Sequence, residues 1–187
     1  MRLAYKAFNA DLTCTMGRGT FQYEPGIWYE EKEANCVKNG FHCASNPLDC
    51  MNYYGSWDDH QFWIVEIDGD IDEDGTDTKI SATKIRLYRR LNLQEFLAHA
   101  ISYIYEHPAL EMNQRVKTAN TEMTDTDKFV IVRNFKPRAM ASKIGQYIGL
   151  IKENPGNRNE IEAAGLFYVD GISTKPYVWY DVEGREC

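Results

Sequence analysis

Alternation of apolar and polar side chains dominates the first half of the chain and predicts β-strands. Residues 3–8 (LAYKAF) alternate, and residues 61–67 (QFWIVEI) combine aromatic with β-branched side chains, a composition typical of strands. Residues 78–90 alternate as well, with one slip in register near Thr83 and Lys84 that indicates a bulge or bend. These segments predict a sheet in the N-terminal half.

Shorter strand-like segments follow the first predicted strand. Residues 20–23 and 27–29 are strand-like and lie on either side of Pro25-Gly26, which is a strong turn signal. We therefore expect a hairpin there. The charged residues 30–38 predict a helical turn.

A short helix is expected at residues 47–54. Asn46 is a good N-cap, and Pro47 loses no needed hydrogen bond at the first helical position. Leu48, Met51 and Tyr54 then share one face, which we expect to point into a core. The strand ending at residue 43, this helix and the strand at 61–67 predict one compact unit.

A longer helix is expected at residues 93–107. Asn92 can cap its start, and Pro108 lies just past its end. Its apolar positions follow the helical period. These positions are Leu93, Phe96, Leu97, Ala100, Ile101 and Ile104.

The character of the chain changes after this helix. Residues 109–127 are polar with little periodicity, and they predict a linker or loose loop. Residues 129–132 predict a short strand. Residues 140–151 favour a helix by composition, although Gly145 and Gly149 weaken that helix.

The C-terminal end again predicts strands. Residues 154–157 (NPGN) form a turn signal. Strand-like residues 161–169 and 173–182 surround Asp170-Gly171, a pair typical of hairpin turns.

The elements together predict an α+β fold. It has a mixed sheet with one short and one long helix in the N-terminal half, and a mostly β C-terminal part. We expect an α+β domain at 1–108, the linker or loose loop at 109–127, and a β-rich region at 128–187 that packs on or follows the first.

Composition narrows the class of protein. The chain has 187 residues, 43% of them hydrophobic, which is ample for a packed core. The net charge of −7 argues against direct nucleic-acid binding, which needs a basic face. No apolar run approaches the roughly 20 residues that span a bilayer, and the first residues lack an apolar signal segment. We expect no membrane association and a cytoplasmic location.

The five cysteines favour reduced thiols rather than a disulfide framework. Cys36, Cys43 and Cys50 lie seven residues apart, with His42 beside the second, whereas zinc-binding pairs are separated by two to four residues. We interpret them as buried, apolar thiols. We expect neither a metal nor a cofactor.

An acidic run follows the central strand. It comprises Asp68, Asp70, Asp72, Glu73, Asp74 and Asp77. A calcium loop has similar alternating carboxylates, but the glycine and the closing glutamate are misplaced here, and a strand follows. A solvated turn is one interpretation. The other is a partner-facing patch, formed with Asp58, Asp59, Glu30, Glu31 and Glu33, that imitates the phosphates of nucleic acid in a basic groove.

A second group of residues indicates enzymatic chemistry. A strand with His42, a helix ending in Tyr53-Tyr54 and a strand with Glu66 resemble ADP-ribosyltransferase-like domains. In those domains a His and a Tyr hold nicotinamide dinucleotide, and a Glu orients the ribose. The resemblance implies that His42, Tyr54 and Glu66 are candidate catalytic residues. The structural alternative is that they are core or rim residues with satisfied polar ends.

A wider resemblance covers roughly Leu3–Arg90 and Lys128–Glu183. Its motifs at the N-terminal end are YKAF (5–8), FQYE (21–24) with Gly26 and Tyr29, GFHC (40–43), PLD (47–49), YY (53–54), VE (65–66), GDI (69–71) and DTK (77–79). Its motifs at the C-terminal end are VIVR (130–133), KIG (143–145), VDG (169–171), KP (175–176) and WY (179–180). They resemble a domain family that is common in phages, prophages and gut Firmicutes.

The resemblance implies a β-rich C-terminal end, and so shifts the interpretation of residues 140–151 from helix toward strands. Many members carry an Ala/Gly-rich repeat of the β-solenoid type, in the place that Arg115–Asp127 occupies here. The family has no established activity. A small acidic chain without a catalytic signature, in a phage-associated family, predicts an inhibitor that binds a bacterial defence protein with a basic groove. A CRISPR effector nuclease is the favoured partner, which would make the chain an anti-CRISPR protein. An ADP-ribosyltransferase-like enzyme, or a degenerate nucleotide-binding relative, is the alternative.

Overall fold

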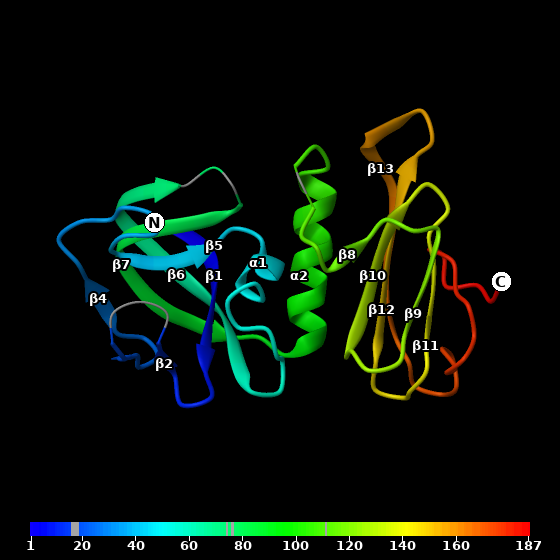
Figure 1. Cartoon of the computed structure of the whole chain (residues 1–187), viewed down its shortest axis with the longest axis horizontal. Helices are drawn as coiled ribbons and strands as arrows, with labels where there is room; N and C mark the ends of the chain where they lie inside the picture. Colours follow the sequence, from blue (N-terminus) through cyan, green and yellow to red (C-terminus); the bar gives the residue numbers. More distant parts are fainter. Residues whose placement is uncertain (16–18, 74, 76, 111) are drawn as a thin grey trace. The chain divides into compact units, whose positions relative to one another are not determined.

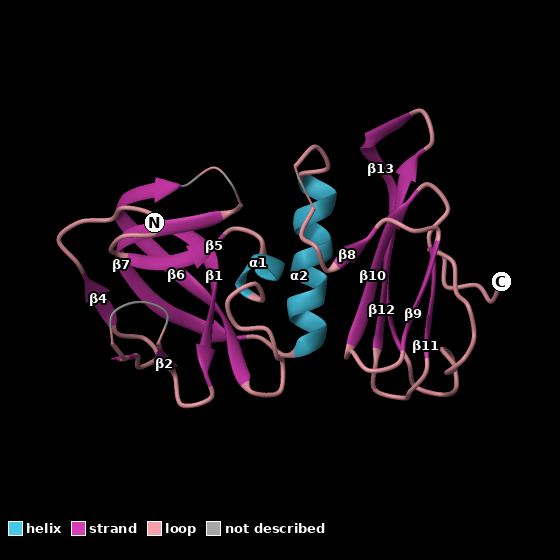
Figure 2. Cartoon of the chain, in the orientation of Figure 1, coloured by secondary structure: helices cyan, strands magenta, loops and turns pink. Residues whose placement is uncertain are grey.

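The fold was analysed in a computed structural model, which describes all residues except 16–18, 74, 76 and 111 (Figure 1). The chain forms two compact units, 1–96 and 97–187. Strands predominate in both, and the described residues include one short and one long helix (Figure 2). The predicted α+β class is therefore confirmed.

The N-terminal unit is built on a sheet that closes on itself. Its elements are β1 (Arg2–Asn9), β2 (Thr13–Cys14), β3 (Phe21–Gln22), β4 (Trp28–Glu30), β5 (Phe41–Ala44), α1 (Pro47–Cys50), β6 (His60–Glu73) and β7 (Lys79–Arg90). The strand order is β4-β7-β5-β1-β6, and β6 also pairs with β7. Most neighbours share several residue pairs, but β1 and β5 pair only at Tyr5 and Ala44. The ring of strands is therefore loosest between β1 and β5.

A bulge bends the long β6–β7 hairpin. Asp68 pairs with Lys84, whereas the next pair is Ile71 with Ala82, so β6 carries the extra residue. Gly69 has a φ of 76°, and the Thr83 hydroxyl would lie 2.1 Å from a Cβ at this position. The same hydroxyl accepts a hydrogen bond from the Asp70 N–H at 2.9 Å. The predicted irregularity near Thr83 is present, with the extra residue on the partner strand.

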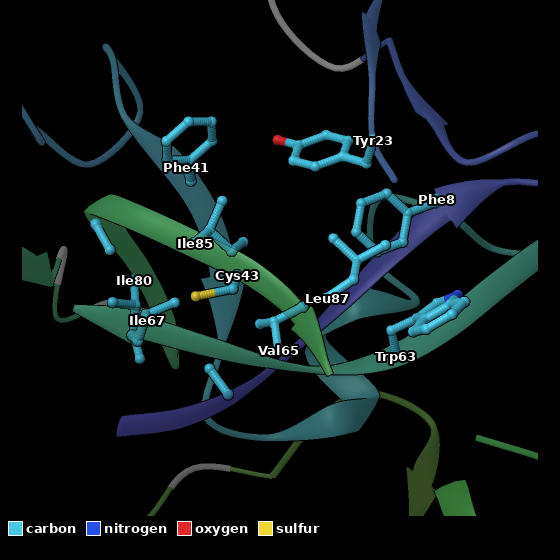
Figure 3. Packing of buried hydrophobic residues seen from close by; sticks show 12 residues of the cluster. Phe8, Tyr23, Phe41, Cys43, Trp63, Val65, Ile67, Ile80, Ile85 and Leu87 are labelled. Atoms are coloured by element: carbon cyan, nitrogen blue, oxygen red, sulfur yellow. The ribbon is translucent and has the colours of Figure 1, made fainter. Parts of the chain in front are cut away.

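Inward-facing side chains fill the ring (Figure 3). Val65 and Ile67 of β6 alternate with outward residues, as the period of a strand requires. Phe8, Tyr23 and Phe41 add aromatic packing at one end, with the rings of Phe8 and Tyr23 5.0 Å apart. Burial of this apolar surface is the main force that stabilises the unit.

Three local predictions for this unit were wrong. Residues 20–23 and 27–29 form no hairpin, because β3 pairs with β2 and β4 pairs with β7. Residues 30–38 contain turns and no helix. The acidic run, which we also interpreted as a solvated turn, is strand from Asp68 to Glu73, because β6 continues to that residue.

Both helices begin as their caps predict. The Asn46 side chain accepts a hydrogen bond from the Leu48 N–H, and Pro47 opens α1. In α2 (Leu93–Glu106) the Asn92 side chain accepts from the Glu95 N–H at 2.9 Å, while the Glu95 carboxylate accepts from the Asn92 N–H at 3.0 Å. This reciprocal pair is a capping box.

The C-terminal unit stacks parallel strands. After the last turns of α2 come β8 (Val116–Lys117), β9 (Thr121–Thr124), β10 (Phe129–Asn134), β11 (Arg138–Ala141), β12 (Tyr147–Asn154) and β13 (Asn157–Tyr168). One sheet has the order β13-β12-β10-β8, and the other pairs β11 with β9. Val116 pairs with Ile131, Glu122 with Ala139 and Ile131 with Gly149, so partners lie 15, 17 and 18 positions apart. Successive passes of the chain therefore lie on one another as solenoid-like coils.

The observed strands and loops of this half differ from those that composition and periodicity predict. The expected linker or loose loop at 109–127 contributes β8 and β9 to the stack. Residues 140–151 are strand and turn, as the family resemblance implies and their composition does not. Residues 173–182 form no strand beyond single bridges at Tyr180, because the Asp170 carboxylate accepts the N–H groups of Ile172, Ser173 and Thr174 and holds a loop.

A buried ion pair organises one end of this unit. Arg133 of β10 donates to Glu153 of β12 at 2.8 Å, and both side chains are only 4% exposed. The same guanidinium donates to the carbonyls of Pro108 and Arg158 at 2.7 and 2.9 Å. Arg133 thus joins the segment after α2 to the β12–β13 hairpin.

We predict that Arg133→Met destabilises the C-terminal unit by about 3–5 kcal/mol, because Glu153 keeps a buried charge without its main partner. Urea unfolding with hydrogen exchange at β10 and β12 measures the change. Arg133→Met/Glu153→Met should recover part of the loss. The control is Lys152→Met, which removes a half-exposed pair with Glu162 and should cost about 0–1 kcal/mol. Equal effects of the two single variants would contradict the prediction.

Candidate functional site

A cavity of about 480 Å³ lies in the N-terminal unit where β1 and β5 separate. Strand β1, strand β5, helix α1 and the β2–β3 region supply its walls. The charged, hydroxyl-bearing, imidazole and aromatic residues among its lining are Lys6, Thr20, Phe21, Tyr23, Glu31, Lys38, Phe41, His42, Asp49, Tyr53, Tyr54, Asp77 and Lys79. A mostly apolar hollow of this size with a few convergent polar groups has the character of a small-molecule site.

Lys6 is the buried cation of this cavity. Its residue is 6% exposed, and its Nζ donates to the His42 carbonyl at 2.6 Å. The ammonium also lies 5.5 Å from the ring centre of Phe8 and 5.8 Å from that of Tyr23. Among the described residues, no carboxylate forms an ion pair with it. Its charge is therefore balanced by one carbonyl dipole and two ring faces.

The ring of His42 is committed to the backbone. Its Nε2 accepts from the Val37 N–H at 2.9 Å, so this nitrogen carries no proton. Partial burial, and then the charges of Lys6 and Lys79, lower the pKa of His42, while a hydrogen bond with the Gly40 backbone opposes that shift. The ring is neutral at pH 7 and holds the loop before β5.

An ion pair between Asp77 and Lys79 forms part of another wall of the cavity. The Asp77 carboxylate accepts the Lys79 N–H at 2.8 Å, and its second oxygen lies 4.0 Å from the Lys79 ammonium. That ammonium lies 5.2 Å from the ring centre of Tyr53. Asp49 is 5% exposed and accepts both the N–H and the hydroxyl of Thr78.

The structure brings together two of the three residues that the transferase resemblance implies. His42 and Tyr54 line the cavity, and the Tyr54 hydroxyl donates to the Cys14 sulfur at 3.1 Å. Glu66 does not line it. Glu66 is buried on β6 and forms an ion pair with Arg86 of β7.

Two of the three cysteines that we interpreted as buried thiols are buried, whereas Cys36 is partly exposed. Cys43 and Cys50 are buried, and burial raises the pKa of Cys43 to about 12 and that of Cys50 further. Neither thiol ionises near neutral pH, so neither is a ready nucleophile or metal ligand. Within the described part of the chain, no three His, Cys, Asp or Glu side chains are placed to hold a metal ion.

The acidic run is exposed but partly paired. Asp68 lies 3.0 Å from the N-terminal ammonium, whose hydrogen bond and charge lower the pKa of the carboxyl. Glu73 accepts from Arg2 at 2.6 Å, and Asp72 accepts the Cys36 N–H at 2.7 Å. Asp70 is exposed, and Asp74 lies outside the described residues.

The predicted acidic set is also spread out. Asp68 and Asp72 face one side of the hairpin opposite Lys84 and Ser81, whereas Glu73 lies opposite the inward Ile80. Asp77 lines the cavity instead. Asp58 and Asp59 are exposed just before the other end of β6, about 30 Å of strand away from Asp68. Glu30 binds Lys84 at 2.9 Å.

Lys6 and Tyr23 are among the cavity residues that the sequence did not identify as site residues. Lys6 shares the inward row of β1 with Ala4 and Phe8, so a charge at an apolar position of the alternation was a readable signal. Tyr23 is 4% exposed, and burial raises the pKa of its hydroxyl well above the ordinary range. It stays a neutral donor.

We predict that His42 makes the N-terminal unit less stable as the pH falls. The folded chain resists protonating His42, while the unfolded chain takes up that proton near pH 6.5. Stability is therefore lost from about pH 6.5 downward until the folded pKa is reached. Urea unfolding at pH 7.5 and 5.5 should show a smaller loss in His42→Gln than in the wild type. His107→Gln, which changes an exposed histidine of the other unit, is the control, and equal slopes in all three proteins would contradict the prediction.

In the part of the chain that the structure describes, neither helix has the length and apolar character needed to cross a bilayer.

Comparison with known proteins gives one match. No curated protein and no solved structure matches the chain. The family described as "Domain of unknown function (DUF7666)" matches residues 2–99, which include the closed sheet, the cavity and the start of α2. The chain belongs to this DUF7666 family.

Proposed function

We propose that this protein acts by binding a macromolecular partner, as an inhibitor of a bacterial defence protein. A CRISPR effector nuclease is the favoured target, because its guide and DNA channels are basic. The proposal places the protein in the cytosol of a bacterial host, encoded by a phage or mobile element. Resemblance to phage and prophage proteins supports this origin.

The observation that carries the proposal is the exposed end of β6. Four carboxylates, Asp68, Asp70, Asp72 and Glu73, lie within six consecutive exposed residues of one hairpin. Alternate residues of a strand are about 7 Å apart, close to the spacing of phosphates along an extended single strand. A rigid hairpin can therefore present negative charge to a groove that accommodates a nucleic-acid backbone.

The pairs already present on this hairpin do not prevent docking. The partners of Asp68 and Glu73 are the N-terminal ammonium and Arg2, and all these side chains are about half exposed. Exposed ion pairs contribute about 0–1 kcal/mol, so a basic groove can displace them. Asp70 has no ion pair with another described residue and needs no displacement.

We predict that Asp68→Lys/Asp70→Lys weakens inhibition of nuclease cleavage at least tenfold and makes the remaining binding less sensitive to salt. Purified CRISPR effector nucleases, together with any partner captured from bacterial lysate, are the targets to assay. Asp125→Lys/Glu160→Lys makes the same charge change on exposed residues of the C-terminal unit and should leave inhibition intact. The proposal fails if both double variants inhibit as well as the wild type, or if no target is inhibited.

The alternative function is an ADP-ribosyltransferase-like enzyme or a degenerate nucleotide-binding relative. His42 and Tyr54 both line the cavity, which favours nucleotide binding within this alternative. The catalytic half needs a carboxylate beside the ribose, whereas Glu66 is held by Arg86.

We therefore predict no transfer and no hydrolysis when the protein is incubated with labelled nicotinamide dinucleotide and host lysate. Gel autoradiography and chromatography of the nucleotide measure the two outcomes. Labelled product that disappears in Glu66→Gln would favour the enzyme over the inhibitor.

A further inference from the structure

We propose that the cavity between β1 and β5 binds a small organic anion, whose carboxylate or phosphate group contacts Lys6 and Tyr23 and whose flat apolar body lies against the aromatic walls. This site is separate from the exposed end of β6. It does not depend on the inhibitor function, and a failure of one leaves the other untouched.

The first step of the argument is the charge of Lys6. An ammonium has three N–H donors, and the described residues use one of them, in the bond to the His42 carbonyl. Its residue is 6% exposed, and no described carboxylate pairs with it. Because a buried charge without a counter-charge is costly, an anion from solution is the missing partner.

Tyr23 supplies a second unused donor. The residue is 4% exposed, and its ring lies near those of Phe8 and Phe41 (Figure 3). The Phe21 ring centre is 4.7 Å away. The hydroxyl forms no hydrogen bond with the described residues, although buried tyrosines usually find a partner. Lys6 and Tyr23 are adjacent, since the ammonium lies 5.8 Å from the centre of the Tyr23 ring.

Several other polar groups of the cavity are already committed, whereas Thr20, Glu31 and Lys38 line it as exposed residues. Asp77 and Lys79 contact each other, and Asp49 holds Thr78. His42 accepts from the backbone. Among the buried polar groups of the cavity, the unused hydrogen-bonding capacity is therefore that of one cation, Lys6, and one neutral donor, Tyr23, and both suit anionic oxygens.

The walls define the rest of the ligand. Phe21 and Phe41 line the cavity, with ring centres 6.0 Å apart, and Phe21 is 40% exposed. Exposed and buried aromatic faces of this kind bind flat, apolar groups. A volume of about 480 Å³ falls within the range of small-ligand sites. Aromatic carboxylates and nucleoside monophosphates both combine an anionic group with a flat ring.

The test is ligand-detected and protein-detected NMR on the full chain. The probes are adenosine monophosphate, indole-3-acetate, inorganic phosphate and the neutral counterpart adenosine. We expect an organic anion to bind with a Kd below about 1 mM, with shifts in β1 and β5, and at least tenfold more tightly than adenosine. The tighter of the two organic anions assigns the group as phosphate or carboxylate.

Two variants decide the role of the donors. Lys6→Met keeps the apolar stem and should weaken binding at least tenfold, and Tyr23→Phe should weaken it several-fold. Lys143→Met removes an exposed lysine of the C-terminal unit and should change nothing. If Lys6→Met does not fold, Tyr23→Phe carries the test alone. The proposal is overturned if none of the organic anions binds, if adenosine binds as tightly as its monophosphate, or if binding survives both variants.

Discussion

Pairing of β7 along both of its edges is the constraint from which the N-terminal unit follows. One edge binds β6 over most of its length, while the other binds β5 and then β4. The sheet closes because β6 pairs with β7 as well as with β1, and the bulge at Gly69 provides the bend that closure needs. The closed sheet has one weak seam, at β1 and β5, where only Tyr5 and Ala44 pair.

Lys6 lies at that seam. Where two strands part, carbonyls lose their ladder partners, and the Lys6 ammonium satisfies that of His42. The side chain thus takes over one backbone hydrogen bond and places a positive charge among aromatic rings. A neutral side chain there would pack at lower electrostatic cost, so the charge is better explained by ligand binding than by stability alone.

Sequence patterns predicted the features that depend on local hydrogen bonds. The caps at Asn46 and Asn92 each depend on residues close together in the chain. The same patterns did not predict which strands far apart in the chain pair with each other. Nothing local in residues 27–29 indicates that they pair with β7, and within the polar stretch residues 116–117 and 121–124 form strands by pairing with β10 and β11. For the candidate site, His42 and Tyr54 were identified from the sequence, whereas Lys6 was not.

The coils of the C-terminal unit have a bearing on how relatives of this protein can differ in length. Each pass presents the next with the same kind of parallel edge, as β8 does to β10 and β10 to β12. An inserted pass would meet the same surface as the one it displaces, and neither end of the stack would need new packing. A stack of this kind could therefore gain or lose whole passes between α2 and β10 without a change in the strand pairing of the closed sheet.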